Sequence, residues 1–308
     1  MKSLKELQPE GWNIPLNKHQ YCAEINRNNP TAIIIMIDQS YSMTTKTRYK
    51  GENKSFAQIV ADMVNELLNE LIGRCTKSEG VRDYFEVCVL GYGGSSTSGV
   101  NVLWDRNLKN KDWVSVSELK QNAMYEKRMV SKNIRGKIKI VEEEIPYWFK
   151  AVANNNTPMG EAFKKANELI SKWIINGHKE SYPPVIINIT DGMQTDMNSK
   201  ELIQEALKIQ ALNTKDGNVL VLNCHISQSG KSIIFPLSVD ELPFDSYAKQ
   251  LFEMSSVMPD LYAKDISSLR YDKDILSGYK GMAFNANMDI LLNFIDIGTS
   301  GSLPKSLI

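Results

Sequence analysis

The sequence predicts an α/β protein whose doubly wound, mostly parallel sheet is flanked by helices and carries one antiparallel edge strand. First, apolar runs alternate with amphipathic stretches along the 308 residues, as strands alternate with helices in such sheets. Second, the run at 31–37 is rich in β-branched apolar residues on both faces, as a strand buried on both sides of a parallel sheet must be, and a further apolar run covers 183–190. Third, Asp38 and Asp191 directly follow these runs, where open parallel sheets place their functional sites. With 42% hydrophobic residues, the chain can form one large domain or two small ones.

The first elements are a strand at 31–37 and a helix at 55–73. The apolar residues of the helix recur with a period of about 3.6, with Ser55 as N-cap and Gly73 as C-terminal stop. A second strand at 84–93 and a hairpin partner for it at 100–105 follow.

A second clear helix is expected at 159–175, with Pro158 at its first position and Thr157 as its cap. A strand is expected after it at 183–192. The remaining expected elements are a helix at 199–212, a strand at 218–226, an edge strand at 232–238 containing Pro236, and helices at 246–256 and 287–294.

The chain divides into an N-terminal extension (1–30), a main domain (31–298) and a C-terminal tail (299–308). The main domain carries a long insertion around 92–150, which begins with the glycine- and serine-rich GYGGSSTSG. That segment lacks the Lys-Ser/Thr of a phosphate loop and no helix follows it at once, so a hairpin loop is favoured.

Composition argues against several classes of protein. The 36 basic residues equal the 36 acidic ones, so neither nucleic acid nor an anionic membrane is favoured as a partner. The basic cluster at 127–139 is followed by three glutamates at 142–144, a pattern typical of a solvated face. The first residues lack the apolar region of a secretory signal, and no apolar run reaches transmembrane length. The four cysteines form no C-x-x-C pair, so a cytoplasmic location is expected.

Five oxygen-bearing residues predict a metal site. Asp38, Ser40 and Ser42 form an Asp-x-Ser-x-Ser run, Thr157 precedes the second helix, and Asp191 begins an Asp-Gly turn. Two carboxylates and three hydroxyls offer only hard oxygen, which suits Mg²⁺, with Mn²⁺ or Ca²⁺ as alternatives, rather than Zn²⁺ or Cu²⁺. The competing interpretation is a capping loop that binds no metal.

These elements and their order resemble the metal-ion-dependent adhesion site of von Willebrand factor A (vWA) domains, over most of the chain from Thr31 onward. The resemblance implies a Rossmann-like fold and a Mg²⁺ with one coordination position open to an Asp or Glu of a protein partner. It also implies that Asp38 binds through water, that Ser40 and Ser42 bind directly, and that Thr157 and Asp191 bind directly or through water.

Three functions remain in competition. The favoured one is a metal-dependent protein-protein interaction module, and the second is a structural subunit whose closed metal site fixes the loops. The third, a Mg²⁺-dependent phosphoryl-transfer or hydrolytic enzyme, is disfavoured because the sequence has no phosphate loop and no histidine in a motif near the site. The chain is similar to intracellular bacterial vWA proteins of stress and defence systems, and its 278–299 segment to the tellurite-resistance-like group. This implies an ATPase, kinase or phosphatase as partner.

Overall fold

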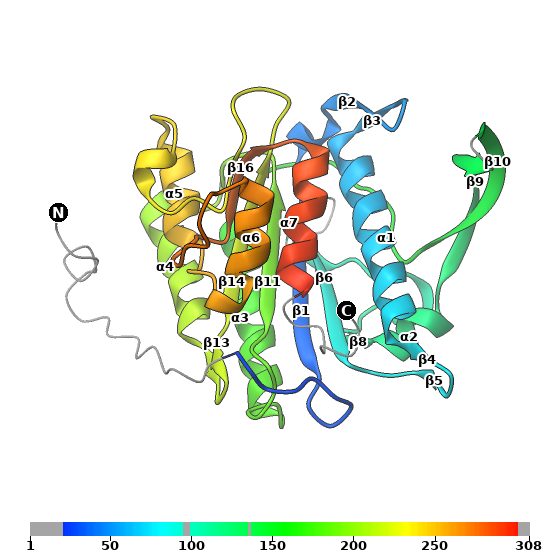
Figure 1. Cartoon of the computed structure of the whole chain (residues 1–308), viewed down its shortest axis with the longest axis horizontal. Coiled ribbons are helices and arrows are strands. Elements are labelled where there is room, and N and C mark those ends of the chain that lie inside the picture. Colours follow the sequence, from blue (N-terminus) through cyan, green and yellow to red (C-terminus); the bar gives the residue numbers. More distant parts are fainter. Residues whose placement is uncertain (1–20, 95–98, 135–136, 301–308) are drawn as a thin grey trace.

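A central sheet lies between two layers of helices in the computed structural model, which describes residues 21–94, 99–134 and 137–300 (Figure 1). Its five inner strands are parallel, and antiparallel strands lie at both edges rather than at one. In spatial order the strands are β15 (Ile233–Ile234), β16 (Met282–Ala286), β14 (Leu220–Ile226), β11 (Val185–Thr190), β1 (Thr31–Gln39), β6 (Phe85–Gly93) and β7 (Val100–Val102), with β8 (Val114–Ser115) also paired to β6. The predicted fold class is confirmed.

The central strand β1 shows why the sheet is covered on both sides. Ile33, Ile35 and Ile37 pack into one hydrophobic core, and Ala32, Ile34 and Met36 pack into the other. All nine residues of β1 are buried, because alternate side chains of a strand point to opposite faces. A strand in the middle of a doubly wound sheet therefore has no polar face, as the sequence pattern indicates.

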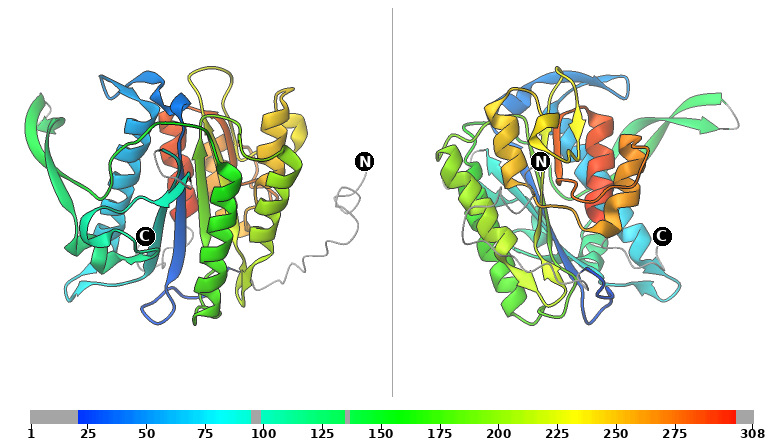
Figure 2. Two further views of the ribbon diagram at one scale, coloured as in Figure 1. Left: turned by 180° about the vertical axis from the view of Figure 1, so that it is seen from behind. Right: turned by 60° about the vertical axis from the view of Figure 1, so that its left-hand side comes forward.

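The helices divide between the two faces (Figures 1 and 2). One face is covered by α1 (Phe56–Cys75), α2 (Val116–Gln121), α6 (Ala263–Arg270) and α7 (Met288–Ser300), and the other by α3 (Met159–Ile175), α4 (Ser199–Ala211) and α5 (Ser246–Met254).

Short 3₁₀ helices are η2 (Tyr41–Thr44), η3 (Arg106–Leu108), η4 (Val239–Glu241) and η5 (Asp260–Tyr262). The small hairpins are β2 (Lys46–Tyr49) with β3 (Glu52–Ser55), β4 (Thr76–Lys77) with β5 (Gly80–Val81), and β12 (Asn213–Thr214) with β13 (Gly217–Asn218).

Helix α1 begins at the predicted cap and ends later than predicted. The Ser55 amide donates to Gln58 Oε1 at 2.9 Å, and the Gln58 amide donates to Ser55 Oγ at 3.2 Å, which forms a capping box. Gly73 does not stop the helix, which continues to Cys75, because the Cys75 side chain is fully buried in the core. The packing of an apolar residue therefore outweighs the helix-ending preference of glycine here.

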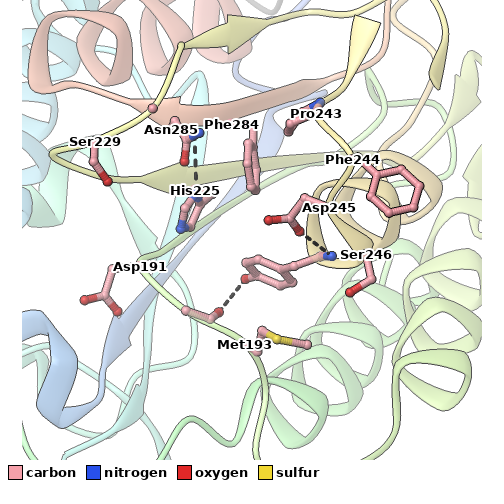
Figure 3. A pocket seen from close by; sticks show the side chains of 13 residues that line it. Asp191, Met193, His225, Ser229, Pro243, Phe244, Asp245, Ser246, Phe284 and Asn285 are labelled. Carbon is pink, nitrogen blue, oxygen red and sulfur yellow. Dashed lines mark hydrogen bonds between the residues drawn. The ribbon is translucent and has the colours of Figure 1, made fainter. Parts of the chain in front are cut away.

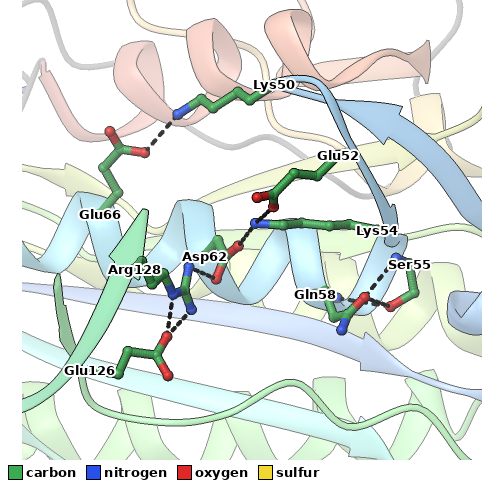
Figure 4. Close-up of polar contacts among 9 residues, drawn as sticks. All are labelled: Lys50, Glu52, Lys54, Ser55, Gln58, Asp62, Glu66, Glu126 and Arg128. Carbon is green, nitrogen blue, oxygen red and sulfur yellow. Dashed lines mark hydrogen bonds and ion pairs between the residues drawn. The ribbon is translucent and has the colours of Figure 1, made fainter. Parts of the chain in front are cut away.

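The long insertion contains a two-stranded antiparallel hairpin, β9 (Met124–Ile134) with β10 (Lys137–Tyr147), that extends away from the domain (Figures 1 and 2). Asp62 on α1 fixes its base: its Oδ1 accepts from Arg128 Nη1 at 2.7 Å, and its Oδ2 accepts from Lys54 Nζ at 3.0 Å (Figure 4). After β10 the chain returns to the core at Trp148, whose amide donates to Asn65 Oδ1 of α1. The GYGGSSTSG segment lies partly outside the described residues, which omit 95–98.

Two parts of the chain differ from the predicted elements. β16 was not predicted, yet it pairs in parallel with β14 and in antiparallel with β15. Helix α7 continues to Ser300, so its last two residues lie in the segment assigned to the tail. Over the described ranges, no helix combines the length and the apolar character needed to cross a membrane.

Candidate metal centre

The loop after β1 folds back on itself and brings three of the predicted ligands together. Asp38 is fully buried at the end of β1, and its Oδ1 accepts from the backbone amide of Ser40 at 2.8 Å. An aspartate that binds the amide two residues later stabilises a turn of this kind. The following 3₁₀ helix places Ser42 beside Ser40, with 2.9 Å between the two hydroxyl oxygens. The Asp-x-Ser-x-Ser spacing therefore produces convergent oxygens.

Asp191 joins the same cluster from the neighbouring strand. β11 is the parallel neighbour of β1, so the carboxyl ends of the two strands meet at one edge of the sheet. The Ser42 hydroxyl donates to Asp191 Oδ1 at 2.6 Å across 149 positions of sequence. Asp38, Ser40, Ser42 and Asp191 thus form one continuous line of polar contacts, which we call the oxygen cluster.

Thr157 lies in a loop that runs along the oxygen cluster. This loop is attached to the end of β1 by two backbone bonds, from Asn154 N to Gln39 O at 2.7 Å and from Tyr41 N to Asn155 O at 3.0 Å. Gly93 allows the close approach, because a Cβ there would lie 2.9 Å from both Asn156 O and Ser40 N. Thr157 is 6% exposed, and within the described residues no hydrogen bond joins its hydroxyl to the oxygen cluster.

The predicted capping role of Thr157 is wrong. The N-cap position of α3 is occupied by Pro158, which has no side chain that can accept a hydrogen bond. The cap comes instead from Asp196, whose carboxylate accepts from the amides of Gly160 at 3.2 Å and Glu161 at 2.8 Å. Thr157 instead donates its amide to Thr195 Oγ1 at 3.0 Å. The loop after β11 therefore supplies the acceptors for these two amides of α3, although it lies more than 30 positions later in the sequence.

Asp196→Ala should lower the free energy of unfolding by about 1 kcal/mol, because both amides at the start of α3 lose their acceptor. Urea unfolding followed by circular dichroism measures the change. Asp196→Asn is the intermediate comparison: its one amide oxygen can accept only one of the two bonds, so its stability should lie between those of Asp196→Ala and the wild type. Equal stability of Asp196→Ala and the wild type would show that this contact does not stabilise α3.

Burial makes the two carboxylates of the oxygen cluster costly to ionise. Burial raises the pKa of Asp38 to about 6; hydrogen bonds from Ser40 and Thr190 oppose this shift, and the nearby Asp191 adds to it. Burial also raises the pKa of Asp191, and the bond from Ser42 opposes it. Within the described ranges, no basic side chain forms an ion pair with either carboxylate. A cation would therefore find two negative charges that no protein group neutralises.

Several residues that position the site were not predicted. The Thr190 hydroxyl donates to Asp38 Oδ2 at 2.7 Å and so fixes the second oxygen of this carboxylate. Below the site, the Tyr92 hydroxyl donates to Asn188 Oδ1 at 2.8 Å, and Asn188 Nδ2 donates to Asn223 Oδ1 at 3.1 Å. Asn223 Nδ2 then donates to Ser255 Oγ at 3.0 Å. This buried polar network joins residues of β6, β11 and β14, with β1 between β6 and β11. The one signal of it in the sequence was an asparagine inside each of two apolar strands.

The donor set fits a hard divalent cation. The described residues contain no cluster of three or more His, Cys, Asp or Glu side chains with the arrangement of a metal site, so two carboxylates and neighbouring hydroxyls are the available donors. Mg²⁺ retains several waters and needs only a few protein oxygens, whereas Zn²⁺ prefers nitrogen and sulfur ligands. The residues present would hold Mg²⁺ or Mn²⁺ better than Zn²⁺.

A recess of about 670 Å³ adjoins Asp191 (Figure 3). It lies between the ends of β14 and β16 and the start of α5. His225, Phe284 and Tyr247 form its walls, and burial lowers the pKa of His225. The Tyr247 hydroxyl donates to the carbonyl of Gly192, directly after Asp191. The structure therefore joins the recess wall to the turn that carries a predicted ligand.

The sequence matches no protein-family model, and it matches no curated protein. Several solved structures resemble the chain at low similarity. One is a von Willebrand factor type A protein from Catenulispora acidiphila, 13% identical, with 70% of this chain and 43% of that chain covered and a TM-score of 0.35.

Two further similar structures are pilus proteins. One is the vWF domain of the type V pili tip protein Mfa5 from Porphyromonas gingivalis, 15% identical, with 54% of this chain and 39% of that chain covered and a TM-score of 0.29. The other is the pilus adhesin RrgA from Streptococcus pneumoniae, 15% identical, with 56% of this chain and 22% of that chain covered and a TM-score of 0.28. The chain spans less than half the length of each of these three structures.

Proposed function

We propose that this chain is a divalent-metal-dependent protein-protein interaction module of the vWA type. The observation that carries the proposal is the oxygen cluster, in which Asp38, Ser40, Ser42 and Asp191 converge at the carboxyl edge of the sheet. These residues, with Thr157 from the adjoining loop, would hold Mg²⁺, or Mn²⁺ or Ca²⁺ in its place. The bound ion would supply a positive charge that attracts an Asp or Glu side chain of a protein partner.

Burial and charge support a site in which the chain holds the metal and a partner approaches it from the solvent side. Asp38 is fully buried and Ser40 is 2% exposed, so they lie on the protein side of the cluster. Ser42 is exposed and Asp191 is partly exposed, so an approaching partner reaches the cluster from their side. Two carboxylates balance a divalent cation, and a further carboxylate from a partner would be held by the ion rather than repelled.

The narrower parts of the proposal concern the cellular setting. We place the chain in a cytoplasmic bacterial stress or defence system, with an ATPase, kinase or phosphatase of that system as partner. This placement rests on the resemblance of the sequence motifs to those of intracellular bacterial vWA proteins. We assign no enzymatic activity, in line with the missing phosphate loop.

A peptide selection tests the proposed function. A random peptide library displayed on phage is bound to the immobilised protein in Mg²⁺, and bound phage are eluted with EDTA. We expect the eluted peptides to share an Asp or Glu, and its replacement by Asn or Gln should abolish binding. If the site is closed and structural, Mn²⁺ should bind while no peptide depends on the metal. That result would contradict the interaction module.

Thr157→Ala separates a role in binding from a role in stability. We expect weaker binding of the selected peptides, by on the order of 1–3 kcal/mol, because one oxygen near the metal is lost. The free energy of unfolding should stay close to wild type, because Asp196 rather than Thr157 caps α3. Titration calorimetry in Mg²⁺ and urea unfolding in EDTA give the two values. Unchanged peptide affinity would show that Thr157 takes no part in the site.

A further inference from the structure

The recess beside Asp191 has aromatic walls. The rings of His225 and Phe284 stack with centroids 4.6 Å apart, and Tyr247 meets His225 edge-on at 5.6 Å. Phe244 stands fully exposed at the mouth, as Figure 3 shows. The hydrogen bond of Tyr247 to the Gly192 carbonyl keeps this wall in place. Phe284 and Tyr247 are 3% and 6% exposed, so Phe244 supplies most of the open aromatic surface. The volume of the recess, about 670 Å³, lies within the usual range of ligand pockets.

Negative charge marks both ends of this recess. Asp191 lies at one end and Asp245 at the other, and none of the residues that line the recess is a lysine or an arginine. Asp245 Oδ1 accepts from the amides of Tyr247 at 2.7 Å and Ala248 at 3.0 Å, so it caps α5. The other carboxylate oxygen of Asp245 points into the recess (Figure 3). An occupant therefore meets the exposed ring of Phe244 and, beyond the predicted metal ligand Asp191, the carboxylate of Asp245.

We propose that this recess binds the guanidinium group of an arginine, carried by the same partner segment that presents a carboxylate to the oxygen cluster. The inference rests on the proposed function, because it names the second group that a partner needs. The recess and the cluster share Asp191, so one short segment reaches both. The expected partner motif contains an acidic residue and an arginine close together in sequence.

Arginine suits the recess better than other side chains. Its planar group stacks on aromatic faces and forms two parallel hydrogen bonds to a carboxylate. The compact, strongly hydrated ammonium of lysine gains less from stacking. An apolar side chain would leave the Asp245 carboxylate desolvated without a partner, which is unfavourable. A second acidic side chain would be repelled by Asp245.

Methylguanidinium is the probe for the recess itself. Its binding is followed by NMR on protein labelled at phenylalanine and tyrosine, with the neutral, similarly shaped methylurea as comparison. With methylguanidinium, we expect changes in the chemical shifts of Phe284 and Tyr247 that saturate as its concentration rises, in EDTA as well as in Mg²⁺. The absence of saturable shifts, or equal shifts with methylurea, would overturn the proposal.

Asp245→Asn tests the charge, because asparagine caps helices as well as aspartate does and so preserves the start of α5. It should weaken methylguanidinium binding roughly tenfold, the loss of one charge-assisted contact. Asp240→Asn is the matched control: it removes the same charge from an exposed position in the same connection, outside the recess. Its affinity should equal that of the wild type. Equal affinity of Asp245→Asn and Asp240→Asn would also overturn the proposal.

The peptides selected for metal-dependent binding provide a second test of the proposal. Replacing their arginine with citrulline, which is uncharged and of similar shape, should lower affinity for the wild type about tenfold and leave affinity for Asp245→Asn unchanged. Equal losses in both proteins, or peptides without an arginine, would contradict the shared segment. If no metal-dependent peptide is recovered, the proposed function fails, and the methylguanidinium titration still decides whether the recess binds a guanidinium.

Discussion

Asp38→Ala is expected to lower the affinity for Mn²⁺ by more than about 100-fold and to abolish measurable Mg²⁺ binding. Asp38 is one of only two carboxylates in the oxygen cluster, and both of its oxygens are fixed, by Ser40 and by Thr190. Loss of a group that merely orients a ligand already costs 10–100-fold in metal affinity, so loss of a charged ligand should cost more. Titration calorimetry with Mn²⁺ measures the change.

Asp38→Asn separates the charge from the loop geometry. Its amide oxygen can still accept from the Ser40 backbone, so the turn after β1 should persist while the negative charge is lost. We therefore expect the free energy of unfolding of this variant in EDTA to be close to that of the wild type. We expect it to bind Mn²⁺ as weakly as Asp38→Ala does. Wild-type Mn²⁺ affinity in both variants would refute the assignment of Asp38 as a ligand.

The fold was predictable because its central elements follow their hydrophobic pattern. β1 and β11 are buried on both faces, and α1 and α3 each bury one stripe, so periodicity alone indicated their type. β16 was not predicted because its five residues are followed, after Asn287, by the start of α7. So short an apolar run shows no periodicity that would identify it as a strand. Its place between β14 and β15 depends on strand order, which local sequence does not contain.

The β9–β10 hairpin was missed for a different reason. It extends away from both cores, and among its described side chains Tyr125, Met129 and Ile140 are more than 60% exposed. Apart from Met124 at its base, the described side chains of the hairpin are exposed or half-buried, so it lacks the buried apolar face from which a strand is identified. Lys127 of β9 pairs with Glu142 of β10 at 2.8 Å, and this charged stretch was interpreted only as a solvated face.

That four of the five predicted ligands converge could be expected from residue type and position, because apolar strands that end in Asp meet at one edge of a parallel sheet. The structure brings four of them into contact and places Thr157 in the adjoining loop. The supporting residues were not identifiable in this way. Asp196 reaches α3 only because the loop after β11 lies beside it, and this proximity follows from the folded topology rather than from any local pattern.

The buried polar network below the site is expected to be the most sensitive part of the core. Asn188 and Asn223 are both fully buried and donate and accept in series between Tyr92 and Ser255. Asn188→Ala should lower the free energy of unfolding by about 3 kcal/mol, since it leaves a cavity and deprives Asn223 Oδ1 of its donor. Urea unfolding followed by tryptophan fluorescence measures the loss.

The Asn188→Ala/Asn223→Ala double variant then shows whether the loss comes from the unpaired group or from the cavity. If the unpaired group matters, removing both partners should cost less than the sum of the single losses, by on the order of 0.5–3 kcal/mol, because no buried amide is left without its neighbour. Strictly additive losses would mean that the two asparagines stabilise the core only by filling space and not through their hydrogen bond. Asn188 lies on β11, three positions before Asp191, which directly follows the strand, so Mn²⁺ titration of these variants adds a functional measure. Weakened Mn²⁺ binding in Asn188→Ala would show that the network fixes the end of β11, and with it the carboxylate that joins the oxygen cluster to the recess.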